Sequence, residues 1–156
     1  MPKAGERTKT QRFKKKGVLE KLHKDIGGLY RATADMAYMN KLRTYEGGCH
    51  CERVRFRVTA DLDTVILCNF SICTKKGIIH LIVPPERFEL LCGNDDLTTY
   101  TFNTGVAKHT FCKHCGIHPF YVPRSDPDKI DVNARCIDDI DLTTLEPTHF
   151  DGRHWE

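Results

Sequence analysis

Two short cysteine pairs lie far apart in this chain and have the spacing of metal ligands: Cys49-x-Cys51 and Cys112-x-x-Cys115. Zinc is commonly held by four thiolates in a tetrahedron, delivered as two closely spaced pairs on tight turns. Glycines precede the first pair and follow the second, and glycine allows the sharp turn that such a site needs. The spacing therefore predicts that these four cysteines form one structural zinc site. The alternatives are four unrelated thiols or two disulfides.

The composition limits the class of protein. The chain of 156 residues has the length of one domain with a tail, and it is 40% hydrophobic and 29% charged. It contains no run of about 18 apolar residues and no apolar signal-peptide core at its N-terminus. Its eight cysteines therefore indicate metal binding in a reducing compartment rather than a secreted disulfide scaffold. We expect an intracellular protein, cytoplasmic, nuclear or both, without membrane contact.

Basic residues are concentrated at the N-terminus. Residues 1–24 hold nine Lys or Arg and two Glu, a net charge of +7, whereas the rest of the chain has a net charge of −4. We expect residues 1–17 to be a basic disordered arm and residues 18–43 to be a helical extension, with helices over 18–26 and 32–42. The arm is either a solvated tail or a contact for nucleic acid or tubulin tails.

From about residue 44 onward the pattern changes to that of short strands. Apolar Val54, Phe56 and Val58 alternate with arginines, which is the period of a strand with one buried face. Short runs of this kind separated by turn residues predict a mainly β fold over residues 44–156, a small sandwich or half-barrel without a long helix. The other predicted strands lie within 65–68, 77–83, 88–92, 98–102, 106–111, 120–122 and 129–137.

Three cysteine motifs in this order resemble a known family. They are GGCHC at 47–51, CNFSIC at 68–73 and FCKHCG at 111–116, accompanied by YTFNT at 100–104 and FYVPRS at 120–125. Together they resemble the glutathione-dependent formaldehyde-activating enzymes, and more narrowly the centromere protein V branch of that family. The resemblance implies a zinc-stapled, mostly β fold of two or three small sheets, with the first and last cysteine pairs holding the structural zinc.

The resemblance also implies a second zinc ion in the active site, held in the family by three cysteines in a C-x-C-x-x-C motif. Here Cys68 and Cys73 occupy the first and third positions, whereas Phe70 stands at the second. Two thiolates alone would bind zinc much more weakly than three, and His80 is a further donor by residue type. Cys68 and Cys73 are therefore either the catalytic and metal-binding residues of this site or two inert buried thiols.

Several other residues are of interest outside these motifs. Cys92 and Cys136 lie in strand-like runs and are predicted to be core residues. His118, just after the last cysteine motif, is predicted to be a structural histidine rather than part of a cleft. Arg124 and Asn103 could hold the carboxylate of a small peptide such as glutathione, because arginine pairs with carboxylates through two hydrogen bonds. An ordinary loop role fits both residues equally well.

Two functions from different classes fit this sequence. The first, implied by the resemblance, is a zinc-dependent carbon–sulfur lyase of the S-hydroxymethylglutathione synthase kind, with Cys68 and Cys73 as ligands and Phe70 as a variation. The second is a non-catalytic zinc scaffold that binds microtubules or chromatin through the basic arm, as the resemblance to centromere protein V suggests. Binding by the arm alone would depend strongly on salt.

Overall fold

The fold was analysed in a computed structural model, which describes residues 35–154. The chain from residue 42 onward forms a compact unit of its own. Residues 35–41 are helical, within the helix predicted over 32–42, whereas the predicted arm over 1–17 and the helix over 18–26 lie outside the described residues. None of the helices among residues 35–154 has the length and apolar character needed to cross a membrane.

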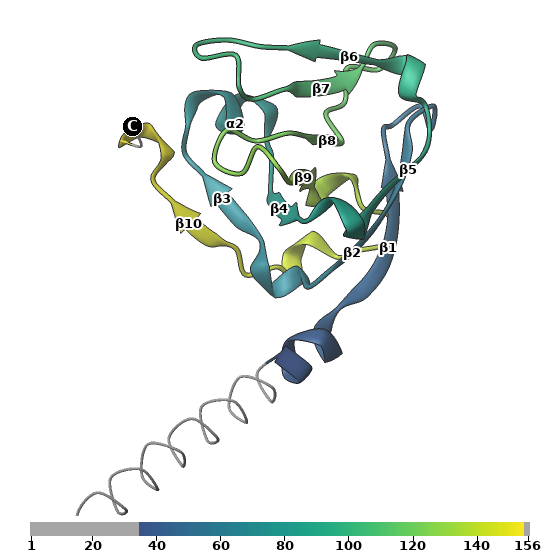
Figure 1. Cartoon of the computed structure of the whole chain (residues 1–156), viewed down its shortest axis with the longest axis vertical. Coiled ribbons are helices and arrows are strands. Elements are labelled where there is room, and N and C mark those ends of the chain that lie inside the picture. Colours follow the sequence, from purple (N-terminus) through teal and green to yellow (C-terminus); the bar gives the residue numbers. More distant parts are fainter. Residues whose placement is uncertain (1–34, 155–156) are drawn as a thin grey trace, which may run out of the picture. The chain divides into compact units, whose positions relative to one another are not determined.

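The compact unit is built mainly from short strands arranged in three sheets (Figure 1), which confirms the predicted mainly β fold. One short helix, α2 (Ser71–Lys76), lies between the third and fourth strands. In the first sheet the strand order is β1 (Arg43–Gly48), β2 (Arg55–Ala60) and β5 (Phe88–Cys92). In the second sheet the order is β10 (Thr148–Phe150), β3 (Ile66–Cys68), β4 (His80–Val83), β9 (Ile130–Asn133) and β8 (Phe120–Tyr121). The third sheet pairs β6 (Leu97–Tyr100) with β7 (His109–Cys112).

The hydrophobic core lies where β2 meets the second sheet. Val54, Phe56 and Val58 are fully buried, as their alternation with arginines predicted. The ring of Phe56 stacks on Phe88 at 5.7 Å and meets the edge of Phe120 at 6.2 Å, so one side chain of β2 contacts β5 and β8. Burying a phenylalanine side chain contributes about 1.5–3 kcal/mol, so this cluster holds the two sheets together.

Two predicted strands are shorter in the structure because other elements interrupt them. The run over 77–83 becomes a strand only at His80, because Gly77 ends α2 in the left-handed conformation with φ 64°. The run over 129–137 ends as a strand at Asn133, whose side chain accepts a hydrogen bond from the backbone of Arg135 and begins a 3₁₀ turn. The strand β10, which pairs with β3 in parallel, was not predicted.

The prediction that Cys92 and Cys136 are core residues is wrong for Cys92. Cys92 is exposed at the end of β5, where its thiol lies 3.5 Å from the carbonyl oxygen of Arg53. Cys136 is half-buried, and burial raises the pKa of its thiol to about 12. A strand of mostly apolar residues can thus end in solvent, which the local pattern does not reveal.

Candidate metal centres and active-site cavity

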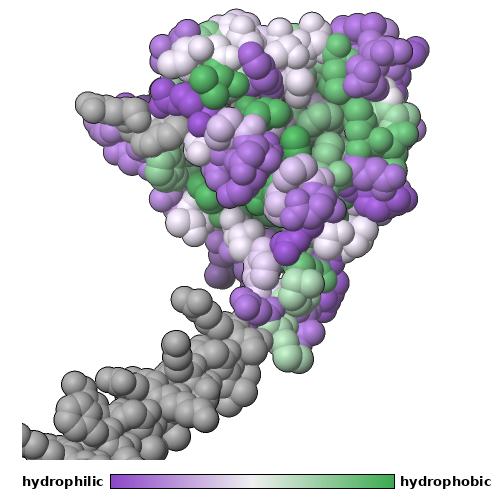
Figure 2. Space-filling view, viewed as in Figure 1, coloured by the Kyte–Doolittle hydropathy of each residue, from purple (hydrophilic) through white to green (hydrophobic). Residues whose placement is uncertain are grey.

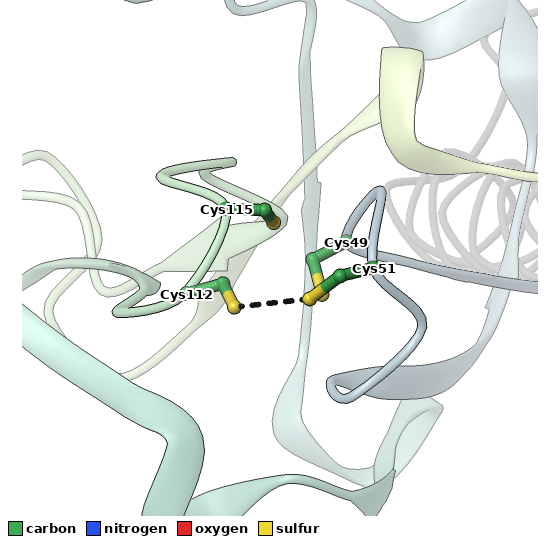
Figure 3. A group of neighbouring side chains, drawn as sticks. All are labelled: Cys49, Cys51, Cys112 and Cys115. Carbon is green, nitrogen blue, oxygen red and sulfur yellow. Dashed lines mark hydrogen bonds between the residues drawn. The ribbon is translucent and has the colours of Figure 1, made fainter.

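The four predicted structural ligands, Cys49, Cys51, Cys112 and Cys115, come together at one point (Figure 3). Their sulfur atoms all lie within 4.8 Å of one another, with 3.5 Å between the first two and 3.6 Å between the second and third. A tetrahedral centre with metal–sulfur bonds of about 2.3 Å places its sulfurs about 3.8 Å apart. A disulfide would need about 2.05 Å. The cluster therefore has the dimensions of a metal site.

The first cysteine pair lies on a tight turn after β1. The backbone N–H of Cys49 donates to Val54 O at 3.0 Å, and the N–H of Glu52 donates to Cys49 O at 3.0 Å. Glu52 itself turns the chain, with φ 61°. The preceding Gly48 was expected to make this bend, but it ends a strand. Packing requires a glycine at this position instead, because the Cβ of any other residue would lie 2.2 Å from Val54 O.

The second pair is held by a similar turn after β7. The N–H of Gly116 donates to Cys112 O at 2.8 Å, and Gly116 has φ 74°, as predicted for a glycine at this position. Burial raises the pKa of the Cys115 thiol, but hydrogen bonds from the backbone N–H groups of Ile117 and Cys51 and from the thiols of Cys112 and Cys51 lower it to about 6. These donors favour the thiolate, the form in which cysteine binds a metal.

A second group of ligand-type atoms comes from Cys68, Cys73 and His80, which lie within 4.8 Å of one another. Cys68 ends β3, Cys73 lies in α2, and His80 begins β4. Because β3 and β4 are antiparallel, with Ile66 opposite His80, the chain returns beside the thiols after α2. Burial, and then the nearby Cys68, raise the pKa of Cys73 to about 12.

The imidazole of His80 is held in the orientation that a metal ligand requires. Its Nδ1 lies 2.7 Å from Oδ2 of Asp131, whose Oδ1 accepts from the backbone N–H of Leu81 at 3.2 Å. Its Nε2 is buried and has no hydrogen-bond partner among the residues of the described range. A carboxylate that fixes the proton on one nitrogen and leaves the other nitrogen for the metal is usual around zinc. The residues present therefore fit a metal ion.

Cys68, Cys73 and His80 line a cavity of about 260 Å³. Its remaining lining is mostly apolar, and the polar residues Asn103 and Arg124 also belong to it. The two residues predicted as carboxylate contacts therefore line the same cavity as the thiols. Figure 2 shows one face of the molecule, on which hydrophobic residues form separate patches between hydrophilic ones.

Two further lining residues, His109 and Tyr121, gave no signal in the sequence. Their rings stack 4.9 Å apart, and Nδ1 of His109 is buried without a hydrogen-bond partner within the described part of the chain. Burial, and then the charge of Lys76, lower the pKa of His109 to about 4, so its imidazole is neutral at pH 7. Burial and the neighbouring Asp131 raise the pKa of Tyr121 well above its usual value.

His118 does not line this cavity but lines another one, and its buried Nε2 has no hydrogen-bond partner within residues 35–154. Its ring is buried, with Nδ1 3.2 Å from the ammonium group of Lys76. Burial, and then Lys76, lower the pKa of His118 to about 3. The neutral imidazole therefore accepts a hydrogen bond from the lysine.

Comparison with known proteins agrees with this geometry. The family model of the glutathione-dependent formaldehyde-activating enzymes matches residues 44–153, which include both cysteine clusters. The chain belongs to this family. A crystal structure of a Rhodobacter sphaeroides protein is similar, with a TM-score of 0.63 and 29% sequence identity, over 67% of this chain and 97% of that chain.

This formaldehyde-activating enzyme family member differs from the motif stated above at Phe70. The Phe70 side chain supplies no metal ligand, and its ring lies 6.3 Å from that of Phe102 at an angle of 17°. Both rings line the cavity. An aromatic side chain therefore stands where the motif has its second cysteine, and the imidazole of His80 comes close to the two remaining thiols from the next strand.

The loop that carries Cys68 and Phe70 is held from outside by residues 150–153. Asn69 donates to Asp151 through its side-chain amide at 2.7 Å, and its amide oxygen accepts from the backbone of Arg153 at 3.0 Å. Gly152 is buried against the loop, and a Cβ at that position would lie 2.5 Å from the sulfur of Cys68. A segment distant in sequence thus fixes the position of a candidate metal ligand.

Proposed function

We propose that this chain is a zinc-dependent carbon–sulfur lyase that cleaves, and in reverse forms, the adduct of a thiol such as glutathione with an aldehyde such as formaldehyde. The observation that carries the proposal is the convergence of Cys68, Cys73 and His80 within 4.8 Å on the wall of a cavity. Three protein ligands leave a fourth position for substrate, as in catalytic zinc sites. Family membership supports the choice of reaction.

The four-cysteine cluster has a different role in this proposal. Four thiolates complete the coordination of zinc and leave no position for substrate. The cluster joins the turn after β1 to the turn after β7, so a metal there would contribute to folding. We assign it to structure and the Cys68, Cys73 and His80 cluster to chemistry.

The candidate metal ligands, Asp131 and His109 each have a defined part in the proposed reaction. When bound, zinc supplies positive charge that stabilises the thiolate of the substrate. Cys68, Cys73 and His80 hold it, and Asp131 keeps the His80 ring oriented through Nδ1. Neutral His109 accepts the hydroxyl proton of the adduct at Nδ1. As the carbon–sulfur bond breaks, its electron pair stays on sulfur and the former O–H pair completes the aldehyde carbonyl. The proton then passes from His109 to the departing thiolate, which leaves as the thiol.

Exchange NMR with ¹³C-labelled formaldehyde and glutathione tests this proposal. We expect metal-loaded protein to accelerate exchange between free aldehyde and the hydroxymethyl thioether. Cys68→Ser should abolish the acceleration while the fold remains, and the exposed Cys92→Ser should leave it unchanged. Exchange no faster than in buffer, or full acceleration by Cys68→Ser, would contradict the lyase proposal.

A non-catalytic role through the N-terminus is the second candidate, favoured by the charge of +7 on residues 1–24. In this role the zinc domain is a scaffold, and the basic segment binds microtubules or nucleic acid inside the cell. Cosedimentation with microtubules or nucleic acid, for the chain with and without residues 1–24 and at several salt concentrations, measures this binding. Binding should disappear on truncation and fall steeply with salt. If neither polymer is bound near physiological salt, this role is excluded.

A further inference from the structure

The cavity beside Cys68 and Cys73 is larger and more apolar than a one-carbon hydroxymethyl group requires. We propose that its preferred substrate is the aldehyde adduct of a thiol that carries an aromatic group on the carbon bonded to its sulfur, as in phenylmethanethiol, and that Phe70 determines this specificity. The inference rests on the proposed function, because it uses the same metal centre. It concerns only the group that the sulfur of the substrate thiol carries.

The first argument comes from a row of nearly parallel rings. Phe102 lies 6.3 Å from Phe70, 5.7 Å from Tyr100 and 5.4 Å from His109, with interplanar angles of 17°, 18° and 19°. Phe70, Phe102 and His109 all line the cavity, whereas Tyr100 does not. Aromatic groups add about 0.5–1.5 kcal/mol when they meet in offset-stacked or edge-to-face contact, beyond the area that they bury. The wall therefore favours a flat aromatic ligand.

The second argument is the size of the cavity. Its volume is about 260 Å³, and its lining includes the apolar side chains of Ile66, Ile72 and Ile82. An apolar cavity of about 150 Å³ is enough to bind benzene. A phenyl group and the adjoining carbon and sulfur therefore fit here. A hydroxymethyl group would leave most of this apolar surface in contact with water, which is unfavourable.

The third argument is charge. Two thiolates and one neutral imidazole give a divalent metal a neutral centre, whereas three thiolates would give it a net charge of −1. The exchange of a thiolate at position 70 for a benzyl group, with His80 as the nitrogen donor, therefore weakens repulsion of an incoming substrate thiolate. It also leaves an apolar surface beside the metal, which an aromatic group on the thiol would remove from contact with water.

A test uses the full chain loaded with Co²⁺, with phenylmethanethiol, 2-mercaptoethanol and glutathione as probes. Added thiol changes the cobalt absorption spectrum only at a centre with an open coordination position, so the spectrum of a four-thiolate centre does not change. We expect phenylmethanethiol to bind at least about tenfold more tightly than 2-mercaptoethanol, and more tightly than glutathione. Equal binding of all three thiols would overturn the inference.

Two variants identify the source of this preference. Phe70→Ala should weaken phenylmethanethiol binding about fivefold or more, while cobalt content and 2-mercaptoethanol binding stay unchanged. Tyr100→Ala removes a ring that belongs to the row but not to the cavity lining, and it should leave the preference intact. A Phe70→Ala variant with undiminished preference would refute the role of this residue.

The outcomes separate the inference from the function on which it rests. If only one cobalt ion binds per chain and no thiol alters the spectrum, the catalytic metal centre is absent and the proposed function fails. If two cobalt ions bind and thiols bind without regard to aromatic character, only the inference fails. His80→Ala, which removes a candidate ligand, should abolish the response to every thiol and so identifies the responding centre.

Discussion

The two cysteine clusters differ in their ligand-type atoms and in their surroundings, and the proposed function gives them different roles. Cys49, Cys51, Cys112 and Cys115 supply four ligands of one kind from two turns with closely similar backbone hydrogen bonds. The second cluster has two sulfurs and one imidazole, all within 13 residues of chain, and it opens onto a cavity. A complete ligand set has no position left for substrate, whereas an incomplete one does. The number and kind of ligands thus separate a folding element from a reaction centre.

The largest effect should follow loss of the first cluster. Cys112 is fully buried, and Cys112→Ser should prevent stable folding, because structural zinc contributes about 10–16 kcal/mol in zinc-finger peptides. Circular dichroism melting and metal analysis measure this. The control is Cys92→Ser at an exposed thiol outside both clusters, which should change the free energy of unfolding by less than about 0.5 kcal/mol. A folded Cys112→Ser protein with an unchanged Tm would remove the contrast between the clusters.

Loss of a ligand from the second cluster should affect metal content far more than folding. Cys68→Ser leaves one sulfur and one nitrogen, so metal affinity at this centre should fall by more than about 100-fold. Metal analysis after dialysis against a weak chelator should give about one equivalent less than wild type. A Tm close to that of wild type is expected alongside. Unchanged metal content would show that this cluster does not bind the ion.

A smaller effect should come from the carboxylate behind His80. Asp131→Asn keeps the size of the side chain but removes its charge, and metal affinity at the second centre should fall about 10- to 100-fold. Competition titration with a coloured chelator measures this. Asp126→Asn is the matched control, because Asp126 lines the same cavity but pairs with Lys129. Equal losses in both variants would refute a specific role for Asp131.

His109 and His118, whose rings lie 6.0 Å apart, should make the free energy of unfolding depend on pH. The pKa of His109 is lowered to about 4 and that of His118 to about 3, mainly by burial. Unfolded chains protonate histidine near pH 6.5, so below that pH the unfolded state binds more protons. The free energy of unfolding should therefore fall as pH falls from about 6.5 towards 4, by at most about 1.4 kcal/mol per pH unit for each histidine.

Urea denaturation at several pH values, with metal content checked at each, measures this slope. His109→Gln should reduce the slope between about pH 6.5 and 4, because it removes one group whose protonation differs between folded and unfolded states. His149→Gln, at an exposed position in β10, serves as the control and should leave the slope unchanged. Parallel curves for wild type and His109→Gln would contradict the assigned burial effect.

The two clusters also differ in how far the sequence predicts them. The four-cysteine cluster can be predicted from the sequence because each pair of ligands lies within a short motif that forms its own turn. His80 and Asp131 come from separate strands, β4 and β9, and only the pairing of these strands brings the two side chains together. Strand register is a long-range property, so the sequence could name His80 by type but could not place it.

The same limit explains the errors in the fold. Alternating Val54, Phe56 and Val58 predicted a half-buried strand correctly, because the period of two is local. The exposure of Cys92 depends on where its strand ends relative to its neighbour, and the pairing of β10 with β3 depends on a segment more than 80 residues away in sequence. Neither the exposure of Cys92 nor the pairing of β10 with β3 produces a recognisable pattern in the local sequence.

The contact between Asn69 and Asp151 has a consequence for the order in which the two centres mature. A chain is synthesised from its N-terminus, and Asp151 is added 82 residues after Asn69. All four ligands of the first cluster have been translated by residue 115, whereas the loop at Cys68 gains its outer support from Gly152 only later. All four ligands of the proposed structural metal are therefore present on the nascent chain before the residues that support the proposed reaction centre.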